Sequence, residues 1–366
     1  MLFNLINSLI CGCPHLLKIF SALCAKLLYV FKMKVLIVRF SSIGDIVLTT
    51  PVVRCLKQQR PDAEVHYLTK SAYRAVVAHN PYIDKCIYLE DDLNKTIEEL
   101  KKERYDYVID LHNNLRTARV KKALGAESHA FPKLNVEKWL LVNFKIDMMP
   151  DKSIVERYFE AVKPLGIRND GQGLDYFIPD TQKITNDDIP MSHWAGYVAC
   201  VIGGSYNTKK FPVEKWKEFC AAVPFPVMLL GGAEDRDEGQ LIVGEDSIKI
   251  YNACGKFNLN ESADLVKRAK VVVTNDTGLM HVATAFRKNV ISLWGNTSPE
   301  MGMFPYYGFN NLKDRVAPQS VIMEKKGLRC HPCSKLGYDK CPKKHFKCMR
   351  DLNVTTIVEQ VISFWN

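Results

Sequence analysis

Residues 271–281 read VVVTNDTGLMH, an apolar run that passes through a short polar turn directly into a helical pattern. Valines favour a strand, and Asp276 or Thr277 can cap the helix that follows. Gly278 lets a ligand approach the backbone closely, and the amides at the helix start suit a pyrophosphate group. His281 lies one turn further along. A plain helix cap would leave the glycine and the histidine unexplained, so we predict an anion site here.

The same alternation of short β-rich runs and helical stretches extends over the chain from Met33. Near-continuous apolar strands are typical of a parallel sheet covered on both faces by helices. The strands predicted in the first half are Val35–Phe40, Glu64–Thr69, Lys85–Leu89 and Tyr107–Leu111. Those predicted in the second half are Tyr197–Ile202, Val227–Leu230, Ile248–Tyr251, Val271–Thr274 and Val290–Trp294. We therefore expect an α/β protein of two Rossmann-like, doubly wound domains that face a central cleft.

The linker between these domains is expected in Gly166–His193, which is rich in Gly, Asp, Asn and Pro. The expected domains span 33–180 and 193–348, and 349–366 is expected to form a C-terminal helix that crosses back to the first half. Residues 1–32 are apolar with few charges and fit neither a signal peptide nor a transmembrane helix. Two interpretations of them stay open: a helix lying in a membrane interface, or translation that begins at Met33.

The composition favours anionic partners, because the 366 residues carry a formal net charge of +10. These partners include nucleotide phosphates and an anionic membrane surface. Nucleic acid is disfavoured, since the basic residues are dispersed and no nucleic-acid-binding module is recognisable. Eight of the 12 cysteines are scattered among apolar neighbours, which is typical of buried thiols in a reducing, cytoplasmic compartment.

The other four cysteines cluster near the C-terminus together with His331 and His345. Such residues can form a tetrahedral zinc site. The long gaps on either side of the third cysteine are unlike the paired spacing of a zinc ribbon, which favours a structural role over a metal. We therefore predict no metal and keep as candidate ligands Cys330, Cys333, Cys341 and Cys348.

A second polar turn follows the first predicted strand, where residues 39–51 read RFSSIGDIVLTTP. Asp45 opens the next helix, and a carboxylate at this position can take a proton from an acceptor hydroxyl as a general base. Asp45 can also be an aspartate that only complements the helix dipole, and the residues alone slightly favour that role. The turn is not Gly-x-Gly-x-x-Gly, which disfavours a dinucleotide-dependent dehydrogenase.

Two glycine-containing turns end successive strands of the second half, at Gly203–Pro212 and Gly231–Asp235. Lys209 in the first turn can neutralise a phosphate, and Glu234 in the second can accept hydrogen bonds from ribose or sugar hydroxyls. Each turn alone is a weak signal, since such turns are common in α/β proteins. Their positions on neighbouring strand ends strengthen the prediction of a nucleotide site.

With these turns in place, the chain resembles the heptosyltransferases of lipopolysaccharide core assembly, glycosyltransferase family nine, which have the GT-B fold. The resemblance extends from Met33 to the C-terminus and is most specific in the SSIGD and DTGLMH turns. It implies an inverting transfer of a sugar from a nucleotide diphosphate donor, with Asp45 as the general base. The donor-binding positions that it implies are Ser205, Lys209, Glu234, Asp276, Thr277, Gly278 and His281.

The resemblance also implies the partners of the reaction. The first domain would bind a lipid-linked glycan acceptor at the inner face of the cytoplasmic membrane, and the second would bind the nucleotide sugar. No tightly bound cofactor is implied, and a loosely bound Mg²⁺ stays open. Gly204 and Ser205 replace a pair of threonines found in the enterobacterial enzymes, so ADP-heptose is the family expectation while another donor stays open. The alternatives are a nucleotide-sugar epimerase of similar fold and a non-catalytic nucleotide- or membrane-binding protein.

Overall fold

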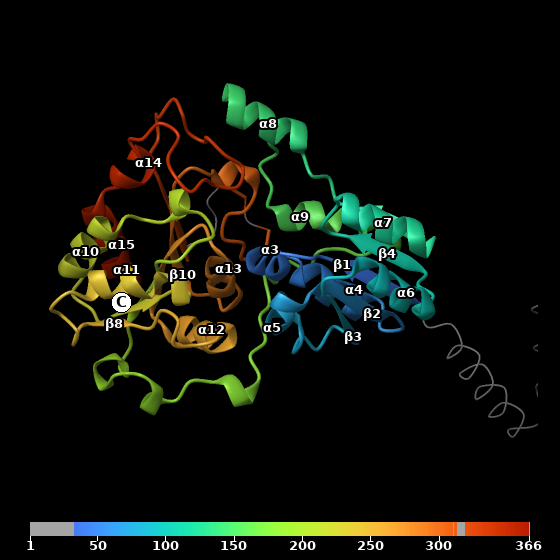
Figure 1. Ribbon diagram of the computed structural model, residues 1–366, viewed down its shortest axis with the longest axis horizontal. Helices are drawn as coiled ribbons and strands as arrows, with labels where there is room; N and C mark the ends of the chain where they lie inside the picture. Colours follow the sequence, from blue (N-terminus) through green and yellow to red (C-terminus); the bar gives the residue numbers. More distant parts are fainter. Residues whose placement is uncertain (1–32, 310, 313–318, 366) are drawn as a thin grey trace, which may run out of the picture.

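The computed structural model describes residues 33–309, 311–312 and 319–365, which form two separate parallel sheets flanked by helices (Figure 1). The first sheet has the strand order β3-β2-β1-β4-β5, and all its neighbours pair in parallel. Its strands are β1 (Lys34–Val38), β2 (Glu64–Lys70), β3 (Lys85–Leu89), β4 (Tyr107–Asp110) and β5 (Glu127–Ala130). Its helices are α3 (Ile43–Val47), α4 (Thr50–Gln59), α5 (Arg74–Val77), α6 (Leu93–Glu103), α7 (Leu115–Leu124), α8 (Asn135–Phe144) and α9 (Ile154–Phe159), with 3-10 turns η1 (Ser71–Tyr73) and η2 (Lys163–Leu165).

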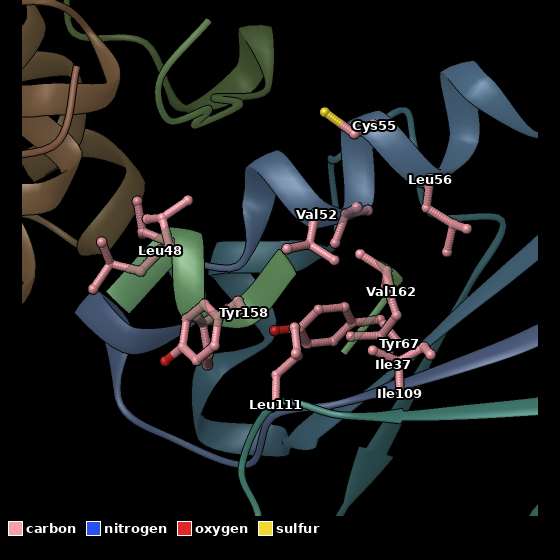
Figure 2. Packing of buried hydrophobic residues seen from close by; sticks show 14 of the residues in the cluster. Ile37, Leu48, Val52, Cys55, Leu56, Tyr67, Ile109, Leu111, Tyr158 and Val162 are labelled. Atoms are coloured by element: carbon pink, nitrogen blue, oxygen red, sulfur yellow. The ribbon is translucent and has the colours of Figure 1, made fainter. Parts of the chain in front are cut away.

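One face of this sheet is covered by α4 and α9, which supply the apolar side chains that Figure 2 shows packed on the strands. Val52 of α4 and Tyr158 of α9 are buried against Ile37 and Tyr67 of the sheet. The Tyr67 hydroxyl shares a hydrogen bond of 2.8 Å with Thr49, so its polar end is satisfied inside the core. Each fully buried side chain of this size stabilises the fold by about 1.5–3 kcal/mol.

The second sheet has the order β11-β10-β9-β6-β7-β8 and is also parallel. Its strands are β6 (Val198–Val201), β7 (Val227–Leu230), β8 (Ile250–Asn252), β9 (Val271–Asn275), β10 (Asn289–Trp294) and β11 (Ser320–Glu324). Its helices are α10 (Val213–Ala222), α11 (Arg236–Val243), α12 (Leu259–Arg268), α13 (Gly278–Ala285), α14 (Lys347–Arg350) and α15 (Val354–Trp365). The remaining 3-10 turns are η3 (Asp180–Gln182), η4 (Asn186–Asp188), η5 (Met191–His193), η6 (Asn207–Lys209), η7 (Ala233–Asp235) and η8 (Pro299–Met301).

The order of both sheets reverses beside their first strand, since β1 lies between β2 and β4, and β6 between β7 and β9. In such sheets ligands bind beyond the carboxyl ends of the strands at this switch point. The turn that carries Asp45 follows β1, and the turns before Lys209 and after Thr274 follow β6 and β9. The topology therefore places these three turns at the switch points, and the Gly231–Asp235 turn lies beside them at the end of β7.

The two halves touch through the N-terminal ends of α3 and α13. A Cβ atom added at Gly44 would lie 2.6 Å from Cδ2 of His281, and one added at Gly278 would lie 2.8 Å from Cγ2 of Ile43. Both distances are shorter than side chains tolerate, so the absence of a side chain at both glycines allows this close approach. The contact brings two segments more than 200 residues apart in sequence to one place.

The nine predicted strands are all present, with ends displaced by at most two residues. The strands β5 and β11 and the helices α7 and α8 were not predicted. β5 has the sequence Glu-Ser-His-Ala and is largely exposed, so it lacks the apolar pattern on which the prediction depended. Within the described residues no helix has the length and apolar character needed to cross a bilayer, and both interpretations of residues 1–32 concern a segment outside the described part of the chain.

The expected C-terminal helix is present, but it does not cross back to the first half. The buried residues of α15, among them Ile357 and Val361, belong to the core of the second half, and Trp365 stacks on Phe225 at 3.9 Å between ring centroids. Helix α15 is amphipathic and packs on α10, so its apolar stripe is used within the second half and does not cross to the first.

Candidate active site

Asp45 lies in the first turn of α3 and is held by two neighbours. The Ser42 amide and hydroxyl donate hydrogen bonds of 3.1 and 2.7 Å to Oδ2, and Nη2 of Arg39 lies 2.5 Å from Oδ1. Burial works to raise the pKa of Asp45, but the Arg39 guanidinium and the Ser42 hydrogen bonds outweigh it and hold this pKa below its ordinary value. Asp45 is therefore ionised at neutral pH, and its position is fixed.

Arg39 is itself buried and anchored. Its Nε donates to the Ser41 carbonyl at 2.8 Å, and its Nη1 donates to the Leu111 carbonyl at 2.5 Å. Three donors of one planar guanidinium thus reach two backbone carbonyls and one carboxylate, which fixes the direction of the arginine. The sequence analysis assigned no role to Arg39, although this residue opens the polar turn of residues 39–51.

The N-terminus of α13 presents backbone amides without a capping side chain. Thr277 occupies the N-cap position with extended backbone, yet its side chain makes no capping hydrogen bond. Asp276 does not cap the helix either, because its Oδ2 accepts from Nζ of Lys209 at 2.6 Å and from Oγ1 of Thr297 at 2.9 Å. The amides of the first helical turn therefore have no capping side chain and can donate to an anion, while Ile43 and Gly44 of the first half occupy the space beside Gly278.

His281 is almost fully buried between the two halves. Burial lowers the pKa of its imidazole to about 4, although the nearby Asp276 and Asp45 carboxylates oppose this shift. Its Nδ1 has no hydrogen-bond partner in the structure. The ring is thus neutral at physiological pH and has one nitrogen available to a ligand.

Successive lysines in the turn after β6 point to different carboxylates. Lys209 pairs with Asp276, whereas Lys210 pairs with Asp235 at 2.6 Å. Asp235 is buried and also accepts from the Gly232 amide at 2.9 Å, so it stabilises the second glycine-containing turn. The pair formed by Lys210 and Asp235 is structural, which leaves Lys209 as the lysine that faces α13.

The structure brings five of the predicted site residues together around the contact of α3 with α13, namely Asp45, Lys209, Asp276, Gly278 and His281. Ser205 and Glu234 are exposed at the ends of β6 and β7, and within the described residues no hydrogen bond joins them to this cluster. Their side chains are available to a ligand on the second half.

A group of cations that the sequence analysis missed lies beside Asp45. Arg157 of α9 is buried; its Nη2 donates to the Met301 carbonyl at 2.7 Å, while Nε and Nη1 have no partner. Burial and the neighbouring Arg157 lower the pKa of Lys138 to about 8, and Asp45 opposes this shift. Burying an arginine without a carboxylate is costly, so these groups are suited to an anionic ligand. The only sequence signal was an arginine inside the apolar helical run after Ser153.

The cysteine-rich segment, residues 330–348, forms hydrogen bonds with the turn that carries Lys209. The Tyr338 amide donates to Oγ1 of Thr208 at 2.8 Å, the Thr208 amide donates to the Tyr338 carbonyl at 3.1 Å, and the Cys333 amide donates to the Asn296 carbonyl. Its four cysteines are free thiols, and Sγ of Cys330 lies 3.6 Å from Nε2 of His345. In the described chain no three of its thiols and imidazoles come within 4.8 Å of one another. That no metal binds here stays a prediction.

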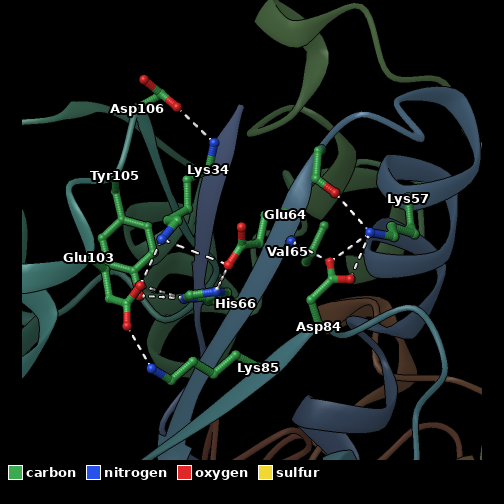
Figure 3. Close-up of polar contacts among 11 residues, drawn as sticks. Lys34, Lys57, Glu64, Val65, His66, Asp84, Lys85, Glu103, Tyr105 and Asp106 are labelled. Carbon is green, nitrogen blue, oxygen red and sulfur yellow. Dashed lines mark hydrogen bonds and ion pairs between the residues drawn. The ribbon is translucent and has the colours of Figure 1, made fainter. Parts of the chain in front are cut away.

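One group of described residues does have metal-like spacing, Glu64, His66 and Glu103. Figure 3 shows it at the amino ends of β1 and β2, where Lys34 and Lys85 pair with Glu103 at 2.8 and 2.5 Å. Two lysines already balance the carboxylates, and the group lies at the opposite end of β1 from Asp45. It is therefore an ion-pair network of the fold, outside the candidate site.

Two parallel α/β sheets whose switch points meet, with a carboxylate on one side and an anion site on the other, define a glycosyltransferase of the GT-B class. The chain belongs to glycosyltransferase family 9 (heptosyltransferase), whose sequence model matches residues 93–314. This range includes the second-half turns and excludes Asp45.

Individual relatives agree with this assignment. The chain is 24% identical over 293 residues to lipopolysaccharide heptosyltransferase 2 of Escherichia coli K12, covering 73% of this chain and 84% of that protein. The solved E. coli ADP-heptose lps heptosyltransferase II matches with a TM-score of 0.67 at 20% identity, covering 91% of this chain and 98% of that one. A family 9 glycosyl transferase from Veillonella parvula matches with a TM-score of 0.69 at 20% identity over 91% and 97%. The expected GT-B fold is confirmed, and the family indicates a glycosyltransferase rather than the epimerase or the non-catalytic alternative.

Proposed function

We propose that this glycosyltransferase moves a heptose from ADP-heptose to the core of a lipid-linked, lipopolysaccharide-type acceptor with inversion, using Asp45 as the general base. The observation that supports the proposal is the contact of α3, which carries Asp45, with the N-terminus of α13. A base from one half and an anion site from the other are the two groups that an inverting transfer needs.

On the donor side, the diphosphate would bind at the amides of Thr277 and Gly278 and displace Asp276 from Lys209. Lys209 would then neutralise the charge that develops on the leaving diphosphate, and the neutral His281 can donate or accept a hydrogen bond there. We assign Ser205 and Glu234 to the ribose or sugar hydroxyls, because both are exposed on the same edge of the second sheet.

The transfer then proceeds in one displacement. The acceptor hydroxyl oxygen attacks the anomeric carbon as the bond from that carbon to the diphosphate oxygen breaks, and Asp45 takes the hydroxyl proton. ADP leaves with its negative charge at α13 and Lys209. No resident metal is required by this arrangement; a loosely bound Mg²⁺ would be revealed by loss of activity on chelation.

On the acceptor side, the unpaired guanidinium nitrogens of Arg157 and the neighbouring Lys138 support an acidic glycan. Carboxylates and phosphates match an arginine in charge and geometry. ADP-heptose and the lipopolysaccharide acceptor agree with the names of the relatives. An acceptor of this kind would place the enzyme at the inner face of the cytoplasmic membrane.

The test is Asp45→Asn measured in two assays. We expect ADP release from ADP-heptose in the presence of acceptor to fall by about 10²–10⁴-fold, the contribution typical of a general base. Stabilisation of the protein by ADP in a thermal-shift assay should stay unchanged, because the nucleotide binds the other half. Transfer at the wild-type rate by the variant would refute the role of Asp45, and a thermal shift with UDP or GDP but not ADP would refute the donor.

A further inference from the structure

We propose that helix α8 and the loop after it dock on a bilayer that carries anionic headgroups. The docking surface consists of Val136, Trp139, Phe144, Ile146 and Met148, and we name it the α8 surface. This inference rests on the proposed function, since a lipid-linked acceptor has to be reached at a membrane, and it assigns that membrane a specific contact.

The α8 surface is the densest group of exposed apolar side chains in the described chain. Trp139 is 55% exposed and Phe144 is 58% exposed, and their rings touch edge to face at 5.1 Å between centroids. Residues 136–148 hold five large exposed apolar side chains, whereas any other stretch of this length in the described residues holds at most two. Scattered exposed apolar residues are ordinary, but a contiguous group indicates an interaction site.

The opposite side of α8 is already occupied. Leu141 is its buried residue, and Lys138 lies close enough to Asp45 and Arg157 for both charges to shift its pKa. The side of the helix that carries Val136 and Trp139 is exposed, so its apolar area is not buried within the chain. Figure 1 shows α8 projecting from the rest of the molecule, beside the cysteine-rich segment.

Charge favours a membrane as the occupant. Residues 136–148 carry two lysines and two carboxylates, so the excess of positive charge comes from the neighbouring cysteine-rich segment. The side chain of Lys145 donates to the Pro332 carbonyl at 2.5 Å and so joins α8 to the cysteine-rich segment. That segment adds exposed apolar residues and exposed lysines, namely Leu336, Tyr338, Lys335, Lys340, Lys343 and Lys344. Aromatic side chains next to lysines are typical of helices that lie in the headgroup region of an anionic bilayer.

A second copy of the chain is a weaker occupant. A stable protein interface buries about 800 Å² on each partner with close complementarity, whereas a single projecting helix offers one narrow stripe. The geometry also links a membrane contact to the site, because Trp139 faces outward from the helix whose Lys138 faces Asp45. A bilayer against the α8 surface would hold the sugar end of a lipid-linked acceptor near the general base.

The experiment compares the full chain with Trp139→Glu/Phe144→Glu in co-flotation with vesicles. The matched control is Leu241→Glu/Ile248→Glu, which changes two side chains of similar exposure, 58% and 79%, on α11 and the loop after it. With vesicles of phosphatidylglycerol and phosphatidylethanolamine, we expect the α8 variant to bind about tenfold more weakly or worse and the control to bind like the wild type. Vesicles of phosphatidylcholine alone should bind the wild type weakly. All variants should keep the melting temperature of the wild type, since the changed side chains are exposed.

Activity separates this inference from the proposed function. The α8 variant should retain wild-type turnover on a deacylated, water-soluble acceptor and lose it on the same acceptor embedded in vesicles. Vesicle binding by the α8 variant equal to that of the wild type overturns the inference, even if the transferase activity stands. Loss of dimerisation in the variant, seen by light scattering, without any vesicle binding by the wild type also overturns it and assigns the surface to a second copy. If the wild type turns over neither acceptor, the proposed function fails while the vesicle result stands alone.

Discussion

The contact between α3 and α13 makes Gly44→Ala an informative perturbation. The added Cβ would lie 2.6 Å from Cδ2 of His281 and 3.3 Å from the Gly278 Cα, so the two halves could not keep their present separation. Within α3 itself the change is favourable, because the φ angle of Gly44 is not positive and alanine stabilises a helix by up to about 1 kcal/mol over glycine. The local and the interdomain effects therefore have opposite signs.

The magnitude follows from overpacking. Inserting a methyl group into a packed contact costs about 1–3 kcal/mol, which corresponds to about 5–150-fold in the population of the assembled site. The second half has a separate core, but the core of the first half continues into the second through Ala263, Val282 and Tyr306, so this cost should act on the approach of the halves and in part on unfolding. We expect kcat/KM to fall by that factor and the melting temperature to change less, because alanine stabilises the helix itself.

The assay is ADP release under limiting acceptor, together with a thermal melt and ADP titration. Gly204→Ala is the matched control, because its added Cβ would meet nothing closer than Cγ of Lys210 at 3.5 Å, an ordinary contact. Because Gly204 lies in the proposed donor turn, the control is compared by its kcat at saturating ADP-heptose, which should stay within about twofold of the wild type since the added Cβ meets no clash. A Gly44→Ala enzyme with wild-type kcat/KM would show that catalysis does not require the contact seen here, and the reasoning would be refuted.

Four further predictions concern charges of the site. Arg39→Gln should raise the pKa of Asp45, because burial then acts without the guanidinium, so the acid limb of the pH profile of kcat/KM should move to higher pH; an unmoved limb would separate Asp45 from catalysis. In the wild type the pKa of Asp45 is lower in the folded than in the unfolded protein. Ionised Asp45 should therefore stabilise the fold at any pH above its unfolded-state pKa, and this stabilisation should be lost as the pH falls through its folded-state pKa. Measuring the free energy of unfolding as a function of pH in the acid range checks this. Lys209→Ala should lower kcat by about 10²–10³-fold, because the variant loses a group that stabilises the charge developing on the leaving diphosphate. Lys210→Ala should instead lower the melting temperature, because Lys210 pairs with the buried Asp235. Equal effects of the two variants on kcat would contradict these separate roles. Arg157→Gln should raise the acceptor KM by about tenfold or more, since hydrogen bonds to charged groups contribute about 1.5–3 kcal/mol, and an effect on the ADP-heptose KM alone would contradict an acceptor role.

The fold was predictable because its signal is local. Runs such as Val227–Leu230 and Val271–Thr274 are buried on both faces and read as continuous apolar segments, so their positions follow from sequence. Strand β5 and helix α8 were missed for the opposite reason, since their side chains are largely exposed and follow no apolar period. The amphipathic pattern of α15 predicts a helix with one buried side, but it does not specify which of the two domains that side packs against.

The candidate site was predictable only as a set of separate turns. The sequence indicated which strand ends carry polar residues, and parallel topology then places those ends on a common edge. It did not indicate that Arg39 and Arg157 belong to the site. Most arginines lie at the surface, so an arginine next to apolar residues is expected there unless its burial is known. It also did not show that Lys209 and Lys210 have different partners, a distinction that depends on the backbone of η6.

The division of charge between the halves suggests how the site avoids binding its products too tightly. On the first half two guanidinium nitrogens of Arg157 have no hydrogen-bond partner, whereas on the second half Lys209 is already paired with Asp276. An acidic acceptor would therefore meet an uncompensated positive site, while the donor diphosphate has to exchange one ion pair for another. The net gain from donor binding at Lys209 is then reduced by the loss of the Asp276 pair, which acts equally in favour of ADP release. Asp276→Asn removes this competition, so it should tighten ADP binding and slow turnover under conditions where ADP release limits the rate; weaker ADP binding by this variant would instead make Asp276 a direct contact of the nucleotide.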